Sequence, residues 1–243
     1  MATKSATILI GENYAHMDPN YLKSPNTKLP MSFDGDSIKY TIKILQEYGY
    51  SMKLITWEEY LRDTITNNNL IIVAQWILIR TKWEMNNLIN FRKKVNDSIA
   101  HGCNFILMHH YWPEFPFSKL LDIDLYEDPQ THRTFFQNKR LFRLFNKNSE
   151  LMNGVEDFIN SNEFKSDEFI YIIRDNSMFE TLIEKIPVKG SDHRFISFGF
   201  QKFDFNNYIF LIDIHNIGKI KTHEQLFSML FHNTLNFINE NGK

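Results

Sequence analysis

The sequence predicts an α/β fold with a mainly parallel central sheet. Three observations lead to this prediction. Short apolar runs alternate with segments whose apolar residues recur at helical spacing, and the connections between them are brief. The run at 105–108 is apolar throughout, which is typical of a strand covered on both faces. That run stops at His109 and His110, and ligands of open α/β sheets bind at the carboxyl ends of such strands.

The first half of the chain supplies four expected strands with helices between them. The strands are expected at 6–11, Ser51–Ile55, 70–74 and Asn104–Met108. The helices are expected at 37–48, 57–66 and 82–100. Asp36 is the expected N-cap of the first helix, and Gly49 and Gly102 follow the first and third helices as C-terminal caps. This alternation predicts parallel strands joined by right-handed crossovers.

The second half is expected to contain fewer regular elements. A short segment at 117–121 precedes a region, 122–165, in which no strand is expected and 131–145 is interpreted as helical or irregular. Further expectations are a strand at 168–174, a hairpin of 194–203 and 208–214, and an amphipathic helix at 221–239. Because no flexible linker or internal repeat interrupts the chain, we expect a single domain over 1–243.

Composition excludes several classes of protein. The 27 Lys and Arg residues nearly balance the 29 Asp and Glu residues, which argues against a nucleic-acid partner. A single cysteine, Cys103, excludes an intrachain disulfide and a paired-cysteine zinc or redox motif. No apolar segment is long enough for a transmembrane helix or a signal peptide. We expect a soluble cytoplasmic protein with no membrane partner; whether it forms a homo-oligomer stays open.

Histidines follow the ends of the expected strands. His109 and His110 follow one strand, His215 follows another, and His16 lies in the loop after the first. Imidazole titrates near neutrality, so these residues are candidates for general acid–base catalysis. Zinc binding is an alternative, although no HxH or HExxH spacing fixes a pair of ligands. The carboxylates that would complete such a site are Glu12, Glu114 and Asp213. The remaining alternative is that the histidines are hydrogen-bonded packing residues.

The candidate site therefore has a catalytic and a binding part. The catalytic candidates are His109, His110 and His215. The candidates for binding a small-molecule ligand are Glu12, Asn13, His16, Trp76, Tyr111, Trp112 and Glu114. Aromatic planes stack on the apolar faces of sugar rings while polar side chains bind the hydroxyls, so this mixture suits a carbohydrate or a nucleoside. A chain this rich in aromatic residues will also place several of them at any edge by chance.

Two other chemistries are disfavoured. Glutamine hydrolysis needs a cysteine directly after the central strand, and that position holds His109. Cys103 precedes the strand, where we expect a small buried residue. The basic and aromatic stretch at 132–145 offers a weaker alternative, a nucleic-acid-associated effector. It is more typical of a helix with an apolar side and a solvated basic side.

Several segments resemble a known family. The opening GENYAHMDPN, the strand AHGCNFILMHH, the stretch DEFIYII and the terminal RFISFGFQKFDFNNYIFLIDIH resemble motifs of the ThuA-like (trehalose-utilisation) proteins. These proteins belong to the class I glutamine amidotransferase-like superfamily. In this resemblance His109 and His215 hold the family's histidine positions, whereas Gly102 alone stands for its glycine run and AQW replaces a histidine-bearing strand end.

The resemblance implies a flavodoxin-like three-layer sandwich and a carbohydrate context. The leading functional hypothesis is binding or transformation of a small polyhydroxylated metabolite at the carboxyl edge of the sheet, without glutaminase activity. The alternative is a catalytically silent ligand-binding or scaffold protein of the same fold, which the departures from the family motifs favour.

Overall fold

The computed structural model describes most of the chain, in segments. The described residues are 4–10, 35–65, 69–74, 85–108, 117–121, 123–125, 142–146, 149–164, 171–173, 177–186, 194–204, 206–214, 217 and 220–241. The chain divides into two compact units. The parallel unit comprises Met1–Met108, Lys202–Ile209 and Ile238–Lys243, and the antiparallel unit comprises His109–Gln201 and Phe210–Phe237. The expectation of a single domain stays a prediction.

The parallel unit contains the four strands expected from the first half of the sequence. They are β1 (Ser5–Leu9), β2 (Ser51–Ile55), β3 (Leu70–Val73) and β4 (Asn104–Met108). All three pairings are parallel, and the strand order is β2-β1-β3-β4. This order matches the start of the flavodoxin-like order 2-1-3-4-5. The prediction of four parallel strands in one sheet is confirmed.

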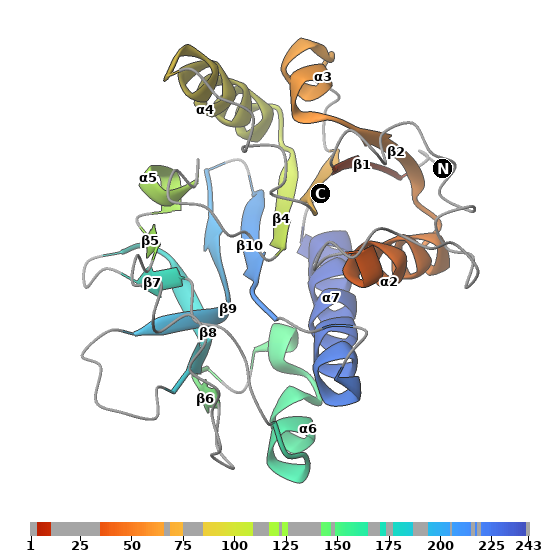
Figure 1. The fold of residues 1–243 in the computed structure, drawn as a ribbon, viewed down its shortest axis with the longest axis vertical. Helices are drawn as coiled ribbons and strands as arrows, with labels where there is room; N and C mark the ends of the chain where they lie inside the picture. The colour runs from red at the N-terminus through yellow and green to blue at the C-terminus, as the bar shows by residue number, and fades with distance from the viewer. Residues whose placement is uncertain are drawn as a thin grey trace. The chain divides into compact units, whose positions relative to one another are not determined.

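Helices cover both faces of these strands (Figure 1). They are α2 (Gly35–Glu47), α3 (Trp57–Arg62) and α4 (Met85–Ala100). In Figure 1, α2 lies on one side of β1 and β2, and α3 and α4 lie on the other. The strand order explains this arrangement. The chain moves in one direction from β1 to β2 and in the opposite direction from β2 to β3, so right-handed crossovers reach opposite faces.

The helix ends differ from some expectations. Helix α2 begins at Gly35, so Asp36 lies in its first turn and is not the N-cap. Helix α3 ends at Arg62, four residues early, because the backbone of Asp63 is extended. The caps at Gly49 and Gly102 are confirmed, since both have a positive φ (73° and 77°) that glycine adopts without strain.

The described strands of the antiparallel unit range from three to eight residues. They are β5 (Ile123–Leu125), β6 (Phe142–Leu144), β7 (Tyr171–Ile173), β8 (Glu180–Lys185) and β9 (Phe195–Lys202), whose last residue belongs to the parallel unit. Strand β7 pairs with β5 and β9, and β8 pairs with β6 and β9, all antiparallel. The expectation of no strand at 122–165 was wrong, and so was the helical interpretation at 142–144.

The expected hairpin is formed by β9 and β10 (Tyr208–Ile212). The amide of Phe203 donates to the carbonyl of Asn207 at the turn (2.9 Å), and the amide of Asp213 donates to Ser197 further along (2.7 Å). The Asn207 side chain then reaches helix α4. Its amide nitrogen donates to the carbonyl of Ile99 and to that of Cys103, both at 2.9 Å. The turn thereby satisfies carbonyls at the end of a helix more than 100 residues earlier.

The described residues also form three further α-helices and one 3₁₀ helix. They are α5 (Ser118–Leu121), the 3₁₀ helix η2 (Glu150–Met152), α6 (Val155–Ser161) and α7 (Lys221–Asn241). Helix α7 confirms the expected amphipathic C-terminal helix, with Leu226, Phe227, Leu230, Phe231 and Leu235 buried. Among the described helices, none has the length and apolar character to cross a membrane. The protein is an α/β protein whose sheet is mainly parallel in its first half, consistent with a flavodoxin-like sandwich.

Candidate functional site

The carboxyl ends of three neighbouring strands lie in register in the parallel unit. Leu9 of β1 pairs with Val73 of β3, and Val73 pairs with Leu107 of β4. From β1 the chain crosses to β2 on one side, whereas from β3 it crosses to β4 on the other. The β1/β3 pair is therefore the topological switch point, where open α/β sheets bind their ligands.

The segments after these strand ends carry most of the residues that the sequence nominated, and His215 follows β10. Apart from Asp213, the candidates lie outside the described residues: Glu12, Asn13, His16, Trp76, His109, His110, Tyr111, Trp112, Glu114 and His215. Their convergence, their catalytic roles and a zinc site stay predictions. Among the described residues, no group of three or more His, Cys, Asp or Glu side chains is placed to hold a metal ion.

Asp213 is the one described carboxylate of the sequence-based set, and it lies in the antiparallel unit, two residues before His215 in the chain. Its Oδ2 accepts a hydrogen bond from Lys185 Nζ at 2.7 Å. Both side chains are fully buried, with 0% exposed. The Ser197 hydroxyl donates to the carbonyl of Asp213 at 3.4 Å, and the Asp213 amide is held by the carbonyl of Ser197. Asp213 is thus fixed through both backbone and side chain.

A second buried carboxylate lies beside Lys185 on strand β8. Glu184 Oε1 accepts bonds from Arg194 Nη2 at 2.5 Å and Arg194 Nε at 2.6 Å. The more distant Arg143 Nη1 lies 3.7 Å from Glu184 Oε2. The Arg194 guanidinium also lies over the ring of Phe145, with 5.7 Å to the centroid. Since both arginines are largely exposed, Glu184 is bound at the edge of the unit, whereas the Lys185–Asp213 pair is wholly withdrawn from water.

The buried Lys185–Asp213 pair has a clear chemical consequence. Two opposite charges without water attract strongly, but their desolvation offsets much of that attraction, so the pair holds a geometry more than it adds stability. Here it holds the end of β10 at the point from which the chain continues to His215. Sequence reasoning missed Lys185 because a lysine beside an apolar segment does not indicate a partner 28 residues away. The one signal that could have found it is a charged residue next to a short apolar segment.

Cys103 behaves as expected for a structural residue. Its side chain is buried directly before β4, at the end of the strand opposite to the switch-point edge. Burial raises the pKa of the Cys103 thiol, which keeps it protonated, and a protonated thiol is a poor nucleophile. The amide of Cys103 is bonded to the carbonyl of Ser98 at 3.0 Å, within the C-terminal turn of α4.

These features define an α/β protein with a flavodoxin-like strand order and a switch-point edge. No family model and no curated protein matches the chain. Solved structures do match it. PurLQS from Thermotoga maritima is 13% identical with a TM-score of 0.56, and the match covers 97% of this chain and 99% of that one. Agd3, a carbohydrate deacetylase, is 10% identical with a TM-score of 0.51. That match covers 96% of this chain but 32% of the deacetylase chain. At these identities the likeness shows a shared fold.

Proposed function

We propose that the carboxyl edge of β1, β3 and β4 binds or transforms a small polyhydroxylated metabolite of carbohydrate type, without glutaminase activity. The single observation that carries the proposal is the register of the strand ends, in which Leu9, Val73 and Leu107 are neighbours. The three segments that begin there carry acidic, histidine and aromatic residues together. Such a combination suits sugar hydroxyls and sugar ring faces.

Two further points support this proposal. The fold is shared with a carbohydrate deacetylase, although a fold hosts many functions and the match spans only part of that enzyme. The sequence motifs also resemble the ThuA-like proteins of the class I glutamine amidotransferase-like superfamily, in which His109 and His215 hold the matching positions. In the proposed mechanism these two histidines exchange protons with a bound hydroxyl or carbonyl group. Asp213 and Lys185 fix the strand that leads to His215.

The position and the burial of Cys103 argue against glutaminase activity. An attacking thiolate is required at the strand end, and the buried Cys103 lies at the other end of β4 with a raised pKa. We expect no release of ammonia from glutamine by the wild-type protein.

Thermal melts test the proposal. A thermal-shift screen of sugars and sugar derivatives selects the probe, and the same probe is then applied to a His109→Ala variant. A bound ligand stabilises by RT ln(1 + [L]/Kd), so a saturating probe should raise the Tm of the wild type and leave that of His109→Ala nearly unchanged.

The matched control is His101→Ala. His101 is an exposed histidine at the amino end of β4, and its ring nitrogen Nδ1 bonds to the carbonyl of Asp97. Its replacement should preserve the ligand-induced shift. Equal shifts in His109→Ala and wild type would remove His109 from the site and favour the alternative of a catalytically silent scaffold.

A further inference from the structure

A polar groove lies on the outer helical layer of the parallel unit, between α3 and α4. It has a volume of about 690 Å³. Helix α3 and the residues after it contribute Glu58, Leu61, Arg62 and Ile65, and helix α4 contributes Asn90, Lys93, Lys94 and Asp97. The α4 residues are spaced i, i+3, i+4 and i+7, so they share one face of that helix, and all four are polar. On the other wall, Ile65 follows the end of α3, and it adds apolar surface together with Leu61. The volume falls within the range typical of small-molecule sites.

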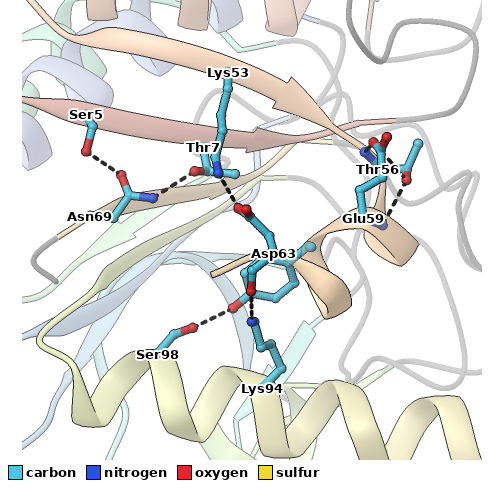
Figure 2. Close-up of polar contacts among 10 residues, drawn as sticks. Ser5, Thr7, Lys53, Thr56, Glu59, Asp63, Asn69, Lys94 and Ser98 are labelled. Atoms are coloured by element: carbon cyan, nitrogen blue, oxygen red, sulfur yellow. Dashed lines mark hydrogen bonds and ion pairs between the residues drawn. The ribbon is translucent and has the colours of Figure 1, made fainter. Parts of the chain in front are cut away.

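The walls of the groove are held in place by the contacts beneath it. The rings of Trp57 and Phe91 meet edge to face with centroids 4.3 Å apart. The hydroxyls of Tyr60 and Ser98 are hydrogen-bonded at 2.8 Å. Lys94 donates to the carbonyl of Asp63 at the end of α3 (Figure 2). Because these contacts join the two helices directly, the groove is formed before any ligand arrives, and binding does not require the helices to be ordered.

The start of α3 is fixed independently. Thr56 and Glu59 form a capping box, in which the Thr56 hydroxyl accepts from the Glu59 amide and the Glu59 carboxylate accepts from the Thr56 amide (Figure 2). Lys53 of β2 pairs with the Asp63 carboxylate at the other end of the helix. Helix α3 is therefore fixed at both ends, so the backbone positions from which its side chains line the groove are fixed as well.

Two cations in the groove are not engaged by the fold. Lys94 already binds the carbonyl of Asp63 and lies over the ring of Tyr60. Among the described residues, by contrast, the side chains of Arg62 and Lys93 make no hydrogen bond or ion pair. The Glu58 and Asp97 carboxylates likewise have no such partner in that part of the chain. The groove thus contains two positively charged and two negatively charged side chains that are available to a ligand.

We propose that this groove binds a phosphorylated polyol, such as a sugar phosphate. Arginine and lysine from opposite walls suit a phosphate group, since charge-assisted hydrogen bonds are the strong ones. The Glu58 and Asp97 carboxylates accept hydrogen bonds from hydroxyl groups, and the side-chain amide of Asn90 both donates and accepts. Leu61 and Ile65 provide the apolar surface that the carbon skeleton covers. The proposal does not rest on the function proposed for the carboxyl edge.

Calorimetric titration of the full chain with glucose 6-phosphate, glucose and inorganic phosphate tests this site. We expect saturable binding of glucose 6-phosphate and much weaker binding of glucose. An Arg62→Gln/Lys93→Gln double variant should weaken the binding of glucose 6-phosphate by about tenfold or more, the size expected for loss of charged hydrogen bonds. Asp97→Ala should weaken the binding of the sugar phosphate relative to that of inorganic phosphate, because it removes an acceptor for hydroxyl groups, whereas the loss of a repulsive charge acts on both phosphates alike.

A matched control removes the same charge elsewhere. Lys43 on α2 and Lys221 on α7 are exposed lysines outside the groove, so a Lys43→Gln/Lys221→Gln variant should bind glucose 6-phosphate as the wild type does. Circular dichroism confirms that each variant is folded. No saturable binding by the wild type, or an equal loss in the control variant, would overturn the proposal. Loss of binding in His109→Ala would also overturn it, because the ligand would then belong to the carboxyl edge.

Discussion

The two units of the molecule treat buried polar groups differently. In the described part of the parallel unit, the buried polar side chains are neutral. Ser5 donates to Asn69, Asn69 donates to Thr7, and Tyr60 and Ser98 share a bond (Figure 2). In the described part of the antiparallel unit, the buried polar set includes charged Glu184, Lys185 and Asp213. The described buried polar side chains of the parallel unit are thus uncharged, whereas those of the antiparallel unit include charged groups in ion pairs.

This difference follows from the strands. Strands of a parallel sheet are covered on both faces, which favours uninterrupted apolar sequences with small polar residues at their ends. In the antiparallel unit, the side chains of Arg143 and Arg194 are 59% and 45% exposed and extend to the buried carboxylate of Glu184. The two units should therefore differ in how much a single substitution lowers the free energy of unfolding. A buried ion that loses its partner costs more free energy than a buried hydroxyl that loses its partner.

The largest effect is expected at the buried ion pair. A Lys185→Met variant leaves the Asp213 carboxylate buried and without its lysine, which should lower the free energy of unfolding by about 3–5 kcal/mol. Urea denaturation followed by circular dichroism measures the change. A Lys185→Met/Asp213→Leu variant should recover most of the loss, because both charges are then absent. A loss of under about 1 kcal/mol in the single variant would show that Asp213 takes up a proton or gains water.

A smaller effect is expected for the neutral pair of the parallel unit. A Tyr60→Phe variant leaves the buried Ser98 hydroxyl without its partner and should lower the free energy of unfolding by about 1–3 kcal/mol. The Tyr60→Phe/Ser98→Ala variant should recover part of the loss, because neither polar atom is then left buried without its partner. The same denaturation assay applies. If Tyr60→Phe proves as costly as Lys185→Met, the contrast between the two units disappears.

The smallest effect concerns alkaline pH. Burial, with repulsion from Tyr48, raises the pKa of Tyr50 to about 12 from its ordinary value of 10.0. The folded state then holds the phenol proton more tightly than the unfolded state. The stability linked to this group is present in full below pH 10 and is lost as the pH rises through 12. The slope of unfolding free energy between pH 10 and 12 should be shallower in Tyr50→Phe. If the slope is unchanged, the pH dependence would be assigned to Tyr60, because burial also raises the pKa of that residue.

The strands of the parallel unit could be predicted because their sequences carry a local signal. Runs such as Phe105–Met108 have no polar residue, and they are bounded by glycine or by caps. The missed strands lack that signal. Strands β5 and β6 have three residues each, and β6 contains Arg143. Their extended backbone depends on pairing with β7 and β8, which local sequence does not encode.

Helix α4 shows what helical spacing alone does not determine. The apolar side chain of Ile89 is 56% exposed, while Phe91 and Val95 of the same helix are buried. Helical spacing predicts that a segment is a helix, but it does not determine which of several neighbouring apolar residues face the core. Sequence reasoning identified the carboxyl ends of the parallel strands because strand ends are local features, and ligand binding at that edge stays a prediction. It missed the Lys185–Asp213 contact and the groove between α3 and α4, since both require two segments to be brought together by the fold.

The bonds from Asn207 to the last turn of α4 bear on how the chain folds as it is made. A growing chain of 108 residues contains all four parallel strands and the helices between them. It still lacks the side chain that satisfies the Ile99 and Cys103 carbonyls, and the Asn104 side chain still lacks the amide of Tyr208 that bonds to it at 2.9 Å. The ribosome must add about a hundred more residues before that end of the helix is complete. The unit that begins at the N-terminus is therefore among the last parts to be finished.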